Sequence, residues 1–260
     1  MNLKKYPEFV KMGFRTFFAY RLDAVSSLLN SVIFLVLMYA VWSSIAASGS
    51  LTGGVDKVIS YIMLGQVISS SVFMNAEKLL SGKIQQGTIV NELKRPISLR
   101  SQTYFHLLGI AVFNTVFVGV PLLLTGIIFL GVDFPGMIRF LWFVLSVFLS
   151  FNMVFMLSYS VSMLIFWTKI GWSLRMMRNN VQRLFSGVYF PLYLLPPPLA
   201  GIFSLLPFQA MVDGPITIFM NPSAPVTGTL LKQVFWIIIL FIVSELLWRK
   251  ARKKLTVQGG

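Results

Sequence analysis

The chain has 260 residues, of which 56% are hydrophobic and only 12% are charged, whereas about a quarter of the residues in a soluble domain are charged. Its 22 basic and 8 acidic residues are too few to give a soluble protein of this size a polar surface, so the composition predicts an integral membrane protein and excludes a soluble enzyme. The chain has no cysteine and only one histidine, His106, which excludes disulfides, thiolate chemistry and multi-histidine metal sites.

The first segment has two faces. Aromatic residues recur at helical spacing between Tyr6 and Phe18, and charged residues between Lys4 and Arg15 form the opposite stripe. This pattern predicts an amphipathic helix over residues 1–22 that lies in the inner membrane interface in contact with lipid. The alternative is a plain cytoplasmic extension of the first span.

Six apolar runs approach the roughly 20 residues that a membrane-spanning helix needs. The chain is therefore expected to be an all-α integral membrane protein with six transmembrane helices, forming a single domain over residues 1–260. The six runs are Ala24–Ala46, Val58–Leu80, Tyr104–Leu130, Ile138–Trp167, Leu184–Leu206 and Val234–Trp248.

Basic residues are concentrated in alternate segments. Lys57, Arg139 and Lys232 lie in the other loops, each accompanied by an aspartate. This bias places the basic segments and both termini in the cytoplasm, and topology alone accounts for the net charge of +14, so nucleic acid is not expected as a partner. The basic segments hold Lys4, Lys5, Lys11, Arg15, Arg21, Lys78, Lys83, Lys94, Arg95, Arg100, Lys169, Arg175, Arg178, Arg183, Arg249, Lys250, Arg252, Lys253 and Lys254.

The loop between the second and third spans, residues 81–100, is too polar to cross a membrane. Four apolar residues within it (Ile84, Ile89, Val90 and Leu93) are spaced for contact, and Pro96 disfavours helical backbone at the residue before it. A short helix with apolar side chains on a cytoplasmic loop suits a groove in a partner protein. A solvated loop whose lysines only set the topology fits the pattern equally well.

Eight of the twelve prolines lie between the fifth and sixth spans, in a stretch that remains apolar. Such a stretch cannot form one straight helix, and non-helical backbone at membrane depth must be buried in protein or face water. We therefore expect a fifth span that stops partway and re-entrant helices over residues 188–228 on the outer side, arranged as a gate or cap over a pathway. The prolines are Pro191, Pro196, Pro197, Pro198, Pro207, Pro215, Pro222 and Pro225.

The sequence offers little chemistry of its own. It lacks the glycine-rich phosphate loop that would let the chain hydrolyse ATP by that route. No carboxylate is centred in a predicted span, which argues against a carrier coupled to protons or sodium. Polar residues do occur in the spans, and for these interhelical hydrogen bonds are the default interpretation over substrate contact. They are Asn30, Gln66, Asn75, Asn114 and Asn152.

Three sequence stretches carry a resemblance to a known family. They are Gly-Lys-Ile-Gln-Gln-Gly-Thr-Ile at 82–89, Leu-Lys-Arg-Pro-Ile-Ser at 93–98, and Gly-Val-Tyr-Phe-Pro-Leu at 187–192, the last followed by Leu-Pro-Phe at 206–208. Together with the amphipathic first segment and the six spans, these stretches resemble the permease subunit of bacterial type-two ABC exporters. The resemblance covers essentially the whole chain.

The resemblance implies a division of labour between chains. Residues 81–100 would carry the coupling helix onto which a separate ABC ATPase subunit docks, residues 1–22 the connecting helix, and residues 188–228 the outer re-entrant helices. Two permease chains, identical or related, would join two ATPases. ATP and magnesium would be bound by the ATPases, and this chain would bind no cofactor. The docking residues implied are Lys83, Ile84, Gly87, Thr88, Ile89, Glu92, Leu93, Arg95 and Pro96.

The family pattern also implies pathway or gate residues on the spans at the centre of the dimer: Gln66, Asn75, Phe185, Tyr189, Phe190 and Pro191. The expected function is that of a permease of an ATP-driven exporter in the bacterial cell membrane, moving a hydrophobic or amphipathic substrate because an apolar pathway favours one. The alternative is a stand-alone secondary carrier or channel. A membrane enzyme acting on lipid would need clustered acids or histidines near an interface, which the eight scattered acids do not provide.

Overall fold

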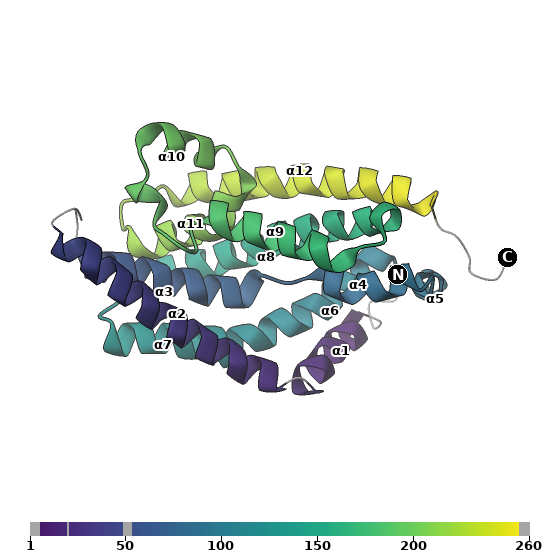
Figure 1. Ribbon diagram of the computed structural model, residues 1–260, viewed down its shortest axis with the longest axis horizontal. Coiled ribbons are helices and arrows are strands. Elements are labelled where there is room, and N and C mark those ends of the chain that lie inside the picture. Colours follow the sequence, from purple (N-terminus) through teal and green to yellow (C-terminus); the bar gives the residue numbers. More distant parts are fainter. Residues whose placement is uncertain (1–5, 20, 49–53, 255–260) are drawn as a thin grey trace.

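The computed structural model describes residues 6–19, 21–48 and 54–254, and this part of the chain is entirely helical, without strands (Figure 1). The elements are α1 (Tyr6–Ala19), α2 (Arg21–Ala47), α3 (Val55–Val72), α4 (Ala76–Gln85), α5 (Ile89–Leu93), α6 (Leu99–Asn114), the π-helical turn η2 (Thr115–Gly119), α7 (Val120–Phe129), α8 (Met137–Thr168), α9 (Gly171–Ser186), the 3-10 turn η3 (Leu192–Leu194), α10 (Pro197–Ser204), α11 (Pro207–Met220) and α12 (Val226–Arg252).

The predicted all-α membrane protein is confirmed. Five helical stretches of the described residues are long and apolar enough to span a membrane, and α10 with α11, bent by 104° at a short break, counts as a sixth if the pair is one span. The long helices run roughly along the longest axis of the molecule (Figure 1). The five stretches are Leu28–Ala47, Val55–Gln85, Leu99–Phe129, Met137–Thr168 and Val226–Arg252.

The range predicted for the fifth span, Leu184–Leu206, is wrong. Its first three residues end α9, and the rest forms a loop, η3 and α10. The helix ends at Ser186 because Gly187 takes a left-handed backbone conformation (φ 86°), which glycine adopts without steric cost. A Cβ at Gly187 would also lie only 2.5 Å from the Tyr61 hydroxyl. Prolines then prevent the chain from resuming a straight helix.

Helix α9 is polar on its buried face and apolar on its exposed face. Arg178, Gln182 and Ser186 are buried on one side. This arrangement is the reverse of a soluble amphipathic helix and is typical of a polar helix in a membrane, where ionisable groups face the protein interior. The exposed apolar side chains are Trp172, Met176, Met177, Val181 and Leu184.

The arginines of α9 do not lie in a loop as predicted. Arg175, Arg178 and Arg183 were expected in a cytoplasmic loop between the fourth and fifth spans, but all three lie on this helix. Helix α9 packs against α4, α8 and α11, so these arginines belong to the body of the helical bundle.

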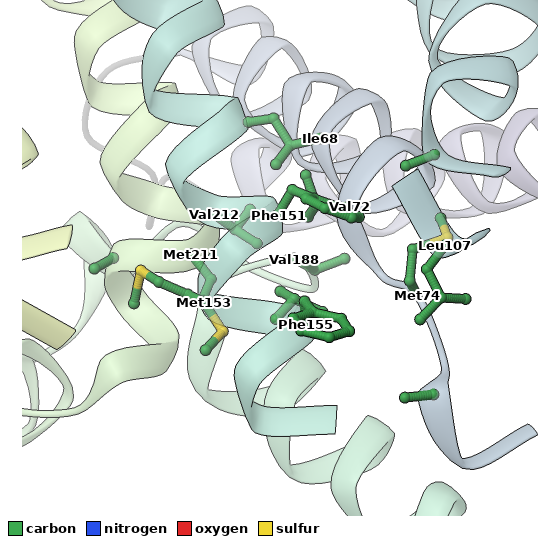
Figure 2. Packing of buried hydrophobic residues seen from close by; sticks show 14 of the residues in the cluster. Ile68, Val72, Met74, Leu107, Phe151, Met153, Phe155, Val188, Met211 and Val212 are labelled. Atoms are coloured by element: carbon green, nitrogen blue, oxygen red, sulfur yellow. The ribbon is translucent and has the colours of Figure 1, made fainter. Parts of the chain in front are cut away.

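The core lies around α3, whose span is 83% buried, whereas that of α2 is 6% buried. Figure 2 shows apolar side chains of α3, α8 and α11 meeting in this core, among them Ile68, Phe151 and Met211. Helices α2 and α12 therefore lie at the periphery, while α3 forms the central column.

Polar side chains fix the outer helices to this bundle. Arg139, at the start of α8, donates hydrogen bonds to the main-chain oxygens of Ile218 (3.2 Å) and Asn221 (2.5 Å), and also to that of Pro222. A guanidinium at a helix C-terminus satisfies orphan carbonyls and complements the helix dipole. Gln233 of α12, fully buried, donates to the oxygens of Ser150 (3.0 Å) and Ala210 (2.9 Å) and so ties α8, α11 and α12 together.

Helix α1 packs directly on α6 through two glycines. A Cβ built on Gly13 would lie 2.3 Å from the main-chain oxygen of His106, and one on Gly109 would lie 2.5 Å from that of Val10. Such close backbone contact is what paired small residues permit in membranes. The helix expected over residues 1–22 is therefore present between Tyr6 and Ala19, while Lys4, Lys5 and the side chains of Tyr6, Phe17 and Phe18 lie outside the described residues.

Substituting Gly109 tests this contact. Gly109→Ala places a methyl group against the main chain of α1, and we expect a loss of about 1–3 kcal/mol in stability, the range found when a packed core is overfilled. The thermal unfolding of the detergent-solubilised protein, followed by size-exclusion chromatography, measures the effect.

Gly82→Ala is the matched control. Gly82 also lies in a helix, but a Cβ there meets no atom within 4 Å, so the higher helix propensity of alanine should raise stability by up to about 1 kcal/mol. Equal thermal stability of the two variants would show that α1 and α6 are not in close contact in the solubilised protein.

Candidate functional site

Helices α4 and α5 form a short arm at one end of the molecule, which we define as residues 76–98 (Figure 1). Gly87, with a φ of 72°, makes the turn between them. Glu92 then holds the arm together, because its carboxylate pairs with Lys83 at 2.6 Å and with Arg95 at 2.9 Å. Gln102 of α6 donates hydrogen bonds to the main-chain oxygens of Glu92 (2.9 Å) and Ile97 (2.7 Å). These contacts hold α4 and α5 in a fixed arrangement.

The structure brings all the expected docking residues together on this arm, but two of them face inward. Ile84 is 3% exposed and Ile89 is 2% exposed, so neither is available to a partner, contrary to the expectation that they are apolar contact residues. Leu93 is half-buried. The apolar residues of the arm do recur with the predicted spacing, but they pack on the chain's own core. The side chains that a partner could reach include Gln85, Gln86, Thr88, Asn91, Lys94, Arg95 and Pro96.

Between α3 and α4 the helix breaks at residues 73–75, and buried polar groups replace the lost helical hydrogen bonds. The Ala76 N–H donates to the Ser158 hydroxyl oxygen at 2.7 Å, and that hydroxyl donates to the Glu77 carboxylate at 2.6 Å. The first turn of α4 is therefore anchored to α8.

Arg178 of α9 also binds the polar side chains next to this break. Its guanidinium binds the Glu77 carboxylate at 2.5 Å, the Asn75 side-chain oxygen at 2.8 Å and the Gln182 side-chain oxygen at 2.6 Å. Glu77 is 0% and Arg178 is 4% exposed. We call Asn75, Glu77, Ser158, Arg178 and Gln182 the polar joint. A pair buried so completely persists only because its remaining hydrogen-bonding positions are satisfied.

The expected pathway residues fall into three places. Gln66 and Tyr189 line a groove of about 700 Å³ between α2, α3 and α9, which we call the groove. Asn75 belongs to the polar joint, where it also accepts a hydrogen bond from Asn179 at 3.1 Å. The rings of Phe185 and Phe190 both lie near that of Phe203 of α10, with centroid distances of 4.9 Å and 6.5 Å. Pro191 immediately precedes η3.

A second polar cluster lies near the opposite end from the arm. The Tyr61 hydroxyl donates to the Asp213 carboxylate at 2.7 Å, and Gln209 donates to the same carboxylate at 2.8 Å while accepting from Lys232 at 2.5 Å. Tyr61, Gln209 and Asp213 line a second cavity of about 690 Å³ next to α10. Sequence reasoning missed this cluster because Asp213 and Lys232 were assigned to an outer loop. Their spacing contains no signal that they meet Tyr61.

Breaking the polar joint on one side should cost far more than removing both charges. Arg178→Met leaves Glu77 buried without a counter-ion, and such losses are typically about 3–5 kcal/mol. The double variant Glu77→Gln/Arg178→Met removes both charges and should regain a large part of that loss. Thermal unfolding of both variants in the same detergent measures the difference. If Arg178→Met is as stable as the unmodified chain, the pair does not hold α4 to α9.

The family model described as ABC-2 family transporter protein matches residues 28–259. This match runs from within α2 past the end of α12, so it includes the arm, the polar joint and the bent helix pair. The search of curated proteins gives no match. The family match spans most of the chain, and the chain therefore belongs to the ABC-2 transporter family, as a membrane-spanning permease of that type.

Proposed function

We propose that the chain is the permease subunit of an ATP-driven exporter, energised by separate ATPase subunits that dock on the arm. The observation that carries this proposal is the arm itself, a hook braced by ion pairs at one end of a bundle whose family works with ABC ATPases. ATP and magnesium bind to the ATPase, and this chain contributes neither a catalytic group nor a cofactor. The cargo is a hydrophobic or amphipathic molecule, since a pathway between mostly apolar helices favours one.

The proposed orientation puts the arm in the cytoplasm of a bacterial cell, with the bundle crossing the cell membrane and both termini inside. Charge supports this orientation. Lys83, Lys94 and Arg95 lie on the arm, and α12 ends there with further basic residues at Arg249, Lys250 and Arg252. The three basic residues expected outside, Lys57, Arg139 and Lys232, are near or in helix starts at the other end. Positive charge favours the cytoplasmic side.

The polar joint offers a mechanical route from the ATPases to the spans. Lys83 and Glu92 connect α5 to α4, and Glu77 and Arg178 connect α4 to α9. Movement of the arm when ATPases close is therefore passed to α9, which contributes Arg183 to the groove. Rigid elements joined by charge-assisted hydrogen bonds transmit displacement better than a flexible linker does.

A second permease chain, identical or related, completes the proposed transporter. Helix α2 exposes a wide apolar surface that includes Leu29, Ile33 and Val36, and α9 exposes its apolar face. Membrane lipid covers whatever part of these surfaces the second chain leaves open. Large apolar faces of this kind are compatible with both neighbours in a bilayer.

Docking on the arm is tested by changing only residues that a partner can reach. The variant Asn91→Glu/Lys94→Glu makes the arm acidic at two exposed positions. We expect at least about a tenfold drop in ATPase co-purified from native membranes, equivalent to about 1.4 kcal/mol of binding free energy. Mass spectrometry identifies the partner and any second permease, and an ATPase assay quantifies it.

The matched control is Lys250→Glu/Lys253→Glu, a charge reversal at exposed positions at the end of α12, which should retain the ATPase. Undiminished co-purification with the arm variant would refute docking at these positions. If the unmodified chain brings down no ATPase in several mild detergents and moves substrate in vesicles without ATP, the protein is instead a carrier or channel.

A further inference from the structure

The groove is a polar site at the middle depth of the bundle. Gln66, Ser69 and Ser70 of α3 line it together with Asn30 of α2, Asn114 of α6 and Arg183 of α9. Asn114 is the midpoint of the span Leu99–Phe129, and Gln66 is well inside the span Val55–Gln85. With Ser26, Ser31 and Tyr189, nine hydrogen-bonding side chains therefore surround one hollow where lipid-facing protein would be apolar.

Arg183 gives the groove a positive charge that pairs with no carboxylate among the side chains the structure describes. Its guanidinium lies 5.4 Å from the centre of the Phe73 ring. None of the ion pairs among the described side chains includes Arg183, and Glu77, Glu92 and Glu245 pair with other basic residues. Arg178, five residues earlier on α9, differs from Arg183 because its guanidinium binds Glu77, Asn75 and Gln182.

An unpaired cation at membrane depth is costly, and it commonly marks a site for a charged ligand. A guanidinium presents a planar fork of donors that fits a carboxylate or a phosphate. The amide and hydroxyl groups around Arg183 can donate further hydrogen bonds to the same anion. The chemistry of the groove therefore selects a negatively charged head group.

The other side of the groove is apolar and borders the periphery of the bundle. Ile33, Phe34 and Leu37 of α2 line it, and the Phe34 ring lies 6.0 Å from that of Tyr189. Because only 6% of the α2 span is buried in the bundle, a hydrocarbon chain attached to the head group has a route past α2 into the bilayer. A small soluble anion would leave this apolar wall unused.

We propose that the groove binds the carboxylate or phosphate head of an anionic amphiphile against Arg183, with its hydrocarbon chain along α2, and that this amphiphile is the transported substrate. The binding part stands on the geometry of the groove, and the identification with the substrate rests on the proposed function.

The test compares two lipid probes on the full chain in phosphatidylcholine nanodiscs. Photoactivatable phosphatidic acid and photoactivatable phosphatidylcholine with the same acyl chains are cross-linked, and labelled peptides are mapped. We expect phosphatidic acid to label peptides of α2, α3 and α9 at least about fivefold more than phosphatidylcholine does, because only its head group is a net anion that pairs with arginine.

Three variants locate the effect. Arg183→Gln should lower phosphatidic acid labelling to the phosphatidylcholine level, and Arg183→Lys should restore most of it, because a point charge still attracts phosphate. Arg175→Gln is the matched control: it removes a positive charge from the same helix at a residue that does not line the groove, and it should leave labelling unchanged. Size-exclusion chromatography of each variant verifies that it is folded.

Several results would overturn the proposal. If the two lipids label the unmodified chain equally, the groove does not select an anionic head group, and this result stands without any variant. Labelling that survives in Arg183→Gln removes Arg183 from the site, as when a second chain supplies its counter-ion. Loss of labelling on addition of millimolar inorganic phosphate identifies a site for soluble anions.

The same preparations separate this inference from the proposed function. A bound ATPase without selective labelling overturns only the groove assignment. Selective labelling that depends on Arg183, without any bound ATPase, overturns the exporter and leaves an anionic-amphiphile site.

Discussion

The ion pair between Glu77 and Arg178 sits where the central column of the bundle is interrupted. The break between α3 and α4 places main-chain groups where water is excluded, and each one left unpaired costs several kcal/mol. Arg178 donates to the Met74 main-chain oxygen at 3.4 Å, and Ser158 accepts from the Ala76 N–H. With the ion pair, α4 is fixed to α8 through Ser158 and to α9 through the guanidinium. The arm can therefore project from the bundle without being detached from it.

The same physical rule governs the opposite end of the molecule. The bent pair α10 and α11 ends in carbonyl groups that no helix satisfies, and Arg139 supplies the donors. Gln233 does the corresponding work between α8, α11 and α12. In each place one long polar side chain reaches from one helix to polar groups of its neighbours, and these buried groups are thereby hydrogen-bonded.

The sequence was most informative where a span is uninterrupted and apolar. Five of the spans follow directly from composition, since any 20 apolar residues in a row satisfy the same length requirement. The position of the fifth could not be found in this way. Helix α9 carries arginines that look cytoplasmic until Glu77, about a hundred residues earlier, is seen to neutralise one of them.

The candidate site divides along similar lines. The arm was visible as a polar, patterned loop, and Gln66 and Tyr189, two of the residues predicted to line a pathway, both line the groove. Which way the apolar residues of the arm face was not predictable, because a periodic stripe fits a partner and the chain's own core equally well. Arg183 was counted as a topology signal, and its place in the groove outside the described ion pairs gives it another meaning.

The order of residues in the polar joint has a consequence for the biogenesis of the protein. An arginine at the centre of an isolated helix costs about 2.5–3.5 kcal/mol on entering the membrane through the insertion machinery. Asn75, Glu77 and Ser158 all precede Arg178 in the chain, so the groups that offset this cost leave the ribosome before the arginine does. Helix α9 can thus enter a membrane in which its partners are already waiting, and an N-terminal half without it would retain a buried glutamate with no counter-ion.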